Sequence, residues 1–95
     1  MDASSIGDST TIVAAGDVLA NDCGSEVVIL NLGDGVYYSL DEVGGRIWNL
    51  LSSPVTMRTI CDAVVAEYDV EPADCERDVR ELIGVLASRG LVEVW

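Results

Sequence analysis

VVILNLGDGVYYSL, residues 27–40, is the stretch of sequence that decides the fold. Its first six residues are aliphatic or β-branched apart from one asparagine, which favours a strand over 27–32. Gly33, Asp34 and Gly35 follow, and Asp-Gly is a strong signal for a tight hairpin turn. Residues 35–40 return as a second strand. The stretch therefore predicts an antiparallel β-hairpin.

Upstream of this hairpin the strand pattern is weaker. Residues 11–15 and 17–22 are both candidates, and one or both supply a first strand to the sheet. We therefore expect a three-stranded antiparallel meander. Residues 1–10 are polar and have no hydrophobic period, which predicts a flexible N-terminal segment, and the folded domain is expected over residues 11–95.

Downstream of the hairpin the apolar period changes from 2 to 3.6, which predicts a helix. Its start is marked twice, because Ser39 and Glu42 have the spacing of a capping box and Asp41 is also a good N-cap residue. Pro54 follows its end. Trp48 falls outside its expected apolar face, which consists of Val43, Ile47, Leu50 and Leu51.

Two further helices and a short β-like tail complete the chain. Thr56 is placed to cap a second helix that runs to about Tyr68, and Pro72 lies in the first turn of a third. Gly90 marks the end of the third helix, and residues 91–95 form the tail. The prediction is one α+β domain, in which a three-stranded antiparallel meander is followed by three helices in a winged helix-turn-helix-like arrangement.

The charge and composition exclude several classes of function. The 95 residues include 17 acidic and 5 basic side chains, all of the latter arginine, with no histidine, for a net charge of −12. Without histidine there is no Ser-His or Cys-His nucleophile and no His metal site, and without lysine there is no P-loop or Schiff base. We therefore expect a protein that is not an enzyme and needs no cofactor.

A winged helix often binds DNA, and a winged-helix transcriptional regulator is the alternative function. The exposed side of the third helix carries both charges: Glu76, Arg77, Asp78, Arg80 and Glu81. Phosphate backbones are bound by an excess of Lys and Arg, so we expect no nucleic-acid partner. The acidic residues that begin this helix lack a calcium-loop pattern and are interpreted as a solvated first turn.

Cysteine usage and the N-terminus predict a cytoplasmic protein. The three cysteines include no C-x-x-C pair, and no signal peptide or membrane-spanning run is recognisable. Cys61 and Cys75 both fall on apolar helix stripes, so we interpret them as small buried hydrophobic residues.

The strand that ends at Leu40 is expected to be an edge of the meander, and it carries no charge or proline to protect that edge. Alternation places Val36, Tyr38 and Leu40 on one face and Tyr37 and Ser39 on the other. Such an edge is a template for an added peptide strand or, in an edge-to-edge dimer, for a second copy. The residues alone leave open whether the edge accepts another chain or is covered by the helices.

The chain resembles the PqqD-like family over roughly residues 26–94. The resemblance lies in the order of several short pieces: Val28-Ile29-Leu30, Gly35-x-Tyr37-Tyr38-x-Leu40-Asp41-x-x-Gly44-x-x-Ile47-Trp48-x-Leu50-Leu51, Thr56…Ile60…Tyr68-x-Val70, Asp78-Val79…Leu82…Leu86 and Gly90-Leu91-Val92. The family often has asparagine where this chain has Asp41, and either residue caps a helix.

This resemblance implies a non-catalytic element that recognises the leader of a ribosomally made, post-translationally modified precursor peptide. The leader would dock as a fourth antiparallel strand on the third strand, with its side chains in the cleft between that strand and the third helix. On the third helix one flank is favoured over the other, which contains Ile83 and Ala87. The implied peptide-binding residues are Val36, Tyr37, Tyr38, Ser39, Leu40, Asp78, Leu82 and Val85.

Within the family, the chain is most similar to the separate leader-binding component of lasso-peptide pathways, which delivers the precursor to a leader peptidase. A chaperone that partners a radical-SAM enzyme is the related alternative. We expect a monomer whose partners are a precursor leader peptide and a leader peptidase or other modifying enzyme.

Overall fold

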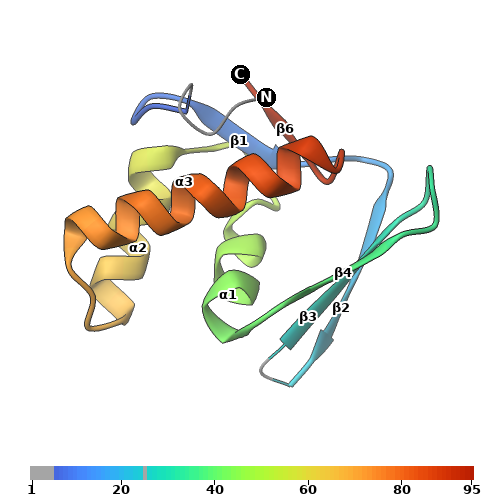
Figure 1. Cartoon of the computed structure of the whole chain (residues 1–95), viewed down its shortest axis with the longest axis horizontal. Helices are drawn as coiled ribbons and strands as arrows, with labels where there is room; N and C mark the ends of the chain where they lie inside the picture. Colours follow the sequence, from blue (N-terminus) through green and yellow to red (C-terminus); the bar gives the residue numbers. More distant parts are fainter. Residues whose placement is uncertain (1–5, 25) are drawn as a thin grey trace.

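Within residues 6–24 and 26–95, which the computed structural model describes, the chain forms two antiparallel sheets and three helices (Figure 1). The α+β fold is therefore confirmed. The elements in chain order are β1 (Thr11–Ala14), β2 (Val18–Cys23), β3 (Glu26–Asn31), β4 (Tyr37–Leu40), α1 (Glu42–Leu50), β5 (Val55–Thr56), α2 (Met57–Glu67), α3 (Pro72–Ser88) and β6 (Val92–Val94).

The predicted meander is the β2-β3-β4 sheet. Leu30 in the central strand pairs with Leu19 on one side and with Tyr37 on the other. The turn between β3 and β4 contains Gly35 at a φ of 73°, a left-handed conformation that glycine adopts without strain. The strand after this turn begins at Tyr37, so Val36 precedes it.

The second sheet was not predicted. The two weak strand candidates are separate strands, because the chain turns at residues 16–17 and sends β1 away from β2. Strand β1 lies at the centre of a β5-β1-β6 sheet, where Ile12 pairs with Val55 and with Val94. The C-terminal tail is thus a strand whose partner lies near the other end of the chain.

The helices begin at residues that satisfy their free amide groups. Asp41 is the N-cap of α1, and its Oδ1 accepts a hydrogen bond from the Gly44 N–H at 2.8 Å. Thr56 caps α2 in the same way, and Pro72 occupies the first turn of α3. Of the two predicted caps for the first helix, Asp41 is therefore the one that forms.

The core lies between the two sheets and the three helices. Its fully buried side chains are Ile6, Ile12, Ile29, Leu51, Met57, Ile60, Ile83, Leu86 and Leu91. Trp48 is also buried, although the sequence placed it off the apolar face of its helix. The reason is that α1 contacts both β3 and α2, so a wider part of its surface is covered.

Part of the segment that we expected to be flexible is packed against the helices. Residues 1–5 lie outside the described residues, but Ile6 is only 2% exposed and belongs to the core. Its carbonyl oxygen accepts a hydrogen bond from Arg80 Nε at 3.0 Å, and Thr10 accepts one from the Met57 N–H at 2.9 Å. For residues 6–10 the structure therefore differs from that expectation, because one apolar side chain holds a polar segment in place.

None of the helices in the described part of the chain is both long enough and apolar enough to cross a membrane.

Candidate binding cleft

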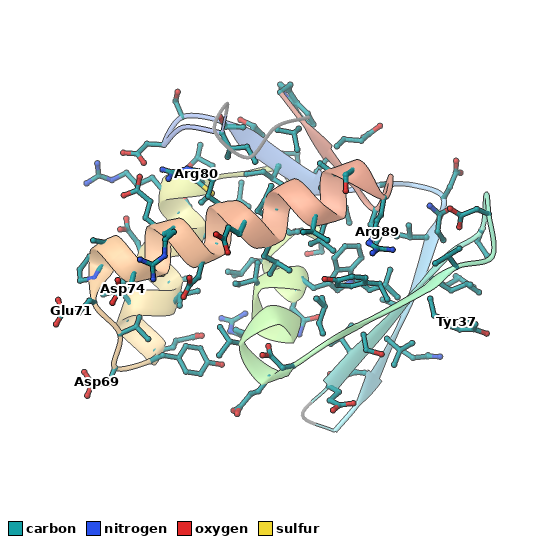
Figure 2. All side chains as sticks on the ribbon, viewed as in Figure 1. Tyr37, Asp69, Glu71, Asp74, Arg80 and Arg89 are labelled. Atoms are coloured by element: carbon teal, nitrogen blue, oxygen red, sulfur yellow. The ribbon has the colours of Figure 1, made fainter. Side chains whose placement is uncertain are left out.

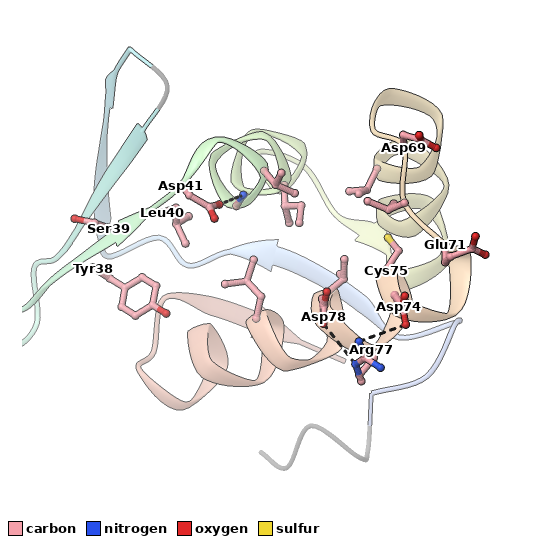
Figure 3. A pocket seen from close by; sticks show the side chains of 17 residues that line it. Tyr38, Ser39, Leu40, Asp41, Asp69, Glu71, Asp74, Cys75, Arg77 and Asp78 are labelled. Carbon is pink, nitrogen blue, oxygen red and sulfur yellow. Dashed lines mark hydrogen bonds and ion pairs between the residues drawn. The ribbon is translucent and has the colours of Figure 1, made fainter.

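An open cleft of about 910 Å³ lies beside the edge strand β4. Strand β4 and the start of α1 form one wall, and α3 with the connection from α2 forms the other (Figure 3). Among the described strands, only β3 pairs with β4, so the other edge of β4 has no strand partner. The cleft therefore combines a free strand edge with a helix face opposite it.

The floor of the cleft is apolar. Leu40 from β4, Ile47 from α1 and Val79 from α3 are all buried side chains that reach its lining. Tyr38 and Leu82 are half-buried and lie nearer its mouth. Such a surface suits apolar side chains of a ligand, because burying them removes apolar area from water.

The rim of the cleft is acidic at the end where α3 begins. Its carboxylates come from the start of α1, the α2–α3 connection and the first turns of α3: Asp41, Asp69, Glu71, Asp74 and Asp78. Arg77 is the only basic residue of the lining, and its guanidinium lies 3.4 Å from Asp74 and 3.5 Å from Asp78 (Figure 3). This end of the cleft therefore favours basic groups in a ligand.

A contact between α3 and the β2-β3-β4 sheet limits the other end. The Arg89 guanidinium lies 5.1 Å from the centre of the Tyr38 ring, within the range of a cation–π interaction. Asn31 Nδ2 also donates a hydrogen bond to the Arg89 carbonyl at 2.9 Å. Together these contacts tie the end of α3 to strands β3 and β4, which sets the width of the cleft.

The free edge of β4 offers main-chain groups at alternate residues. The Asn31 N–H donates to the Val36 carbonyl at 3.0 Å, so these two residues form a hydrogen-bonded pair. Such pairs alternate along an antiparallel ladder, which makes Tyr38 the next residue of β4 that bonds to β3. The N–H and C=O groups of Tyr37 and Ser39 therefore point away from β3, toward an added strand.

The structure brings five of the eight predicted peptide-binding residues to the cleft. These five are Tyr38, Ser39, Leu40, Asp78 and Leu82. Val36, Tyr37 and Val85 are exposed and do not line it, and Tyr37 instead lies on the opposite face of the sheet. On α3 the alternative flank turns inward, because Ile83 is fully buried in the core.

Sequence reasoning missed the contributions of α1 and of the α2–α3 connection. Val43 and Ile47 line the cleft from α1, and Asp69, Val70 and Glu71 line it from the connection. The acidic start of α3 was interpreted as solvated only, but Asp74 and Asp78 face the cleft. The exposed valine within an acidic connection, at Val70, was the available signal.

The thiols near the cleft are poor nucleophiles. Burial raises the pKa of Cys61 to about 12, and it also raises the pKa of Cys75 above its usual value. The Cys75 Sγ donates a weak hydrogen bond to the Cys61 carbonyl at 3.9 Å. Both cysteines are therefore neutral thiols near pH 7. No group of residues in the described ranges is arranged to hold a metal ion.

Comparisons with known proteins agree with this geometry. The family described as coenzyme PQQ synthesis protein D (PqqD) matches residues 26–92. A structure of TbiB1 in complex with the TbiA(beta) leader peptide is 40% identical, with a TM-score of 0.80 over 85% of this chain and 94% of that one. A lasso peptide synthetase B1 complexed with the leader peptide shares the fold at 22% identity, with a TM-score of 0.76 over 86% and 96% of the two chains. No curated protein matched the chain.

Proposed function

The chain belongs to the PqqD family, and from this membership we propose that it is a non-catalytic module that binds the leader of a ribosomally made precursor peptide. The observation that carries the proposal is the free, uncharged edge of β4 beside an apolar cleft. The 40% identity with TbiB1, whose structure contains a leader peptide, supports the same assignment.

Strand addition on β4 explains how one module holds an extended peptide. The outward main-chain groups of Tyr37 and Ser39 would pair with the leader and set its register. Alternate leader side chains would enter the cleft, where Leu40 and Leu82 supply apolar contacts. In this mechanism the cleft provides most of the affinity, and the strand edge provides direction.

The partner enzyme in this proposal is a leader peptidase of a lasso-peptide pathway, and a radical-SAM enzyme is the alternative. Because the described thiols are neutral and the chain contains no histidine, the chemistry is assigned to that partner. Holding the leader on a module that also binds the enzyme raises the effective concentration of substrate to the millimolar range, on the order of that reached by short flexible tethers.

The arginines of α3 argue against the winged-helix regulator. Arg77 is shared between two carboxylates, and Arg80 pairs with Glu76 and donates to the Ile6 carbonyl. A recognition helix that reads DNA needs such groups free to contact bases and phosphates.

A labelled synthetic leader, taken from the precursor encoded beside this chain, tests the proposal by fluorescence anisotropy. Ser39→Pro removes an outward-facing donor without removing a β3 hydrogen bond, so it should weaken leader binding by about tenfold. Ser39→Ala is the matched control, because it keeps the amide, and it should bind within about threefold of the wild type.

The folded state of both variants is checked by circular dichroism. If Ser39→Pro is folded and binds the leader as tightly as the wild type, strand addition on β4 is the wrong mechanism. If the wild type binds no leader, the proposed function itself fails.

A further inference from the structure

The face of the β2-β3-β4 sheet that points away from the helices carries a row of large apolar side chains. Leu19, Leu30 and Tyr37 lie side by side across the three strands, because Leu30 pairs with both of the others. Leu32, just after β3, adds a fourth apolar side chain that is 55% exposed. We call these four residues the outer face of the sheet.

The outer face has no cover within the described part of the chain. Leu19 is 58% exposed and Tyr37 is 66% exposed, whereas Val27 and Ile29 on the opposite face are buried. The helices lie on that opposite side, and Figure 2 shows Tyr37 pointing away from them (Figures 1 and 2). Single exposed apolar residues are common, but a row that crosses three strands marks an interaction surface.

The charge of the chain argues about the occupant. The next row of the same face, Asn21, Val28 and Ser39, is also uncharged, although the chain as a whole carries −12. Two copies of so acidic a chain repel each other, which disfavours a second copy on this face. Depletion of charge at the centre of an apolar patch is typical of an interface with another protein.

The outer face is continuous with the strand edge on which the leader is proposed to add. Tyr37 and Ser39 belong to β4 and have side chains on this face, so a strand added there would place every second leader side chain on the same surface. A protein seated on the outer face would therefore contact the module and the exposed half of the leader together. This property fits the enzyme that acts on the leader-bearing precursor.

We propose that the outer face of the β2-β3-β4 sheet is the docking surface for the processing enzyme. The proposal rests on the proposed function, since it takes that enzyme as the occupant. In this arrangement the two faces of one sheet have separate roles: the helix-covered side forms the cleft, and the outer face recruits the enzyme. The leader on β4 lies at the border between them.

The test measures direct binding of this chain to the leader peptidase encoded in the same gene cluster, by biolayer interferometry without any leader present. A Leu19→Thr/Leu32→Gln double variant removes apolar area far from the cleft, and threonine keeps the strand propensity of β2. We expect it to bind the peptidase at least about tenfold more weakly than the wild type. Leu32→Gln alone, in the turn, should show a smaller loss and guards against a folding defect.

Trp95→Ser is the matched control, because Trp95 is 64% exposed but belongs to neither the outer face nor the cleft. It should bind the peptidase within about twofold of the wild type. The docking proposal is overturned if the double variant binds like the wild type, if the wild type does not bind the peptidase, or if sedimentation shows a wild-type dimer that the double variant abolishes.

Leader anisotropy separates this result from the proposed function. The double variant should bind the labelled leader within about twofold of the wild type, because neither substituted residue lines the cleft. A wild type that binds the peptidase but no leader would overturn the proposed function and leave the docking result standing.

Discussion

Two consecutive glycines in α1 allow that helix to lie close to the sheet. A Cβ atom on Gly45 would lie 2.8 Å from Val27 Cγ2, and one on Gly44 would lie 3.3 Å from Leu40 Cβ. Glycine within a helix costs about 1 kcal/mol relative to alanine, so its presence here indicates a packing requirement. The close approach places Ile47 and Leu40 together in the floor of the cleft.

Gly45→Ala should therefore lower the free energy of unfolding, by about 1 kcal/mol, because the clash with Val27 outweighs the gain in helix propensity. Urea unfolding followed by circular dichroism measures the change. In a Val27→Ala background the same substitution should become stabilising, since the obstructing methyl is gone. A stabilising effect in the wild-type background would contradict the close packing of α1 on β3.

At the level of elements, local signals were predicted well and distant pairings were not. The meander, the three helices and the free edge of β4 follow from turn residues, periodicity and caps that lie within a few positions of each other. The β5-β1-β6 sheet joins Ile12 to Val94, and no local pattern names a partner so far along the chain. For the cleft, the residues on β4 and α3 were predictable, but Val70 was not, because its place depends on how α2 and α3 are arranged.

The N-terminal segment behaves as an added element of the helical layer. Ile6 fills a buried position, and its carbonyl is bonded to Arg80 of α3. A single apolar residue among polar neighbours gives no periodic signal, which explains why the segment was expected to be loose. A domain boundary at residue 11 would therefore cut through contacts of the core.

Ile6→Ala should lower the free energy of unfolding by about 2 kcal/mol, at the low end for a buried isoleucine because the segment is near a chain end. Thermal or urea denaturation provides the measurement. Ile6→Val is the graded control and should cost about 1 kcal/mol. Equal stability of all three proteins would show that residues 6–10 do not contribute to the fold in solution.

On the scale of the whole molecule, charge and apolar surface are separated. The acidic residues give the chain its charge of −12 and surround one end of the cleft, whereas the outer face and the cleft floor are uncharged. Long-range charge acts mainly on the rate of encounter, and close apolar contacts act on the lifetime of a complex. The two properties therefore make different predictions about how a leader binds.

Association with a leader peptide of net positive charge should slow by about tenfold when salt is raised from about 10 mM to about 150 mM, because the Debye length falls from about 30 Å to about 8 Å. The dissociation rate should change little, since the bound side chains lie on the apolar floor formed by Leu40 and Val79. Stopped-flow anisotropy measures both rates. A leader whose lysines and arginines are replaced by glutamine is the control, and its association rate should be nearly independent of salt. If both peptides respond equally to salt, or if dissociation carries the whole effect, the acidic rim does not steer the leader to the cleft.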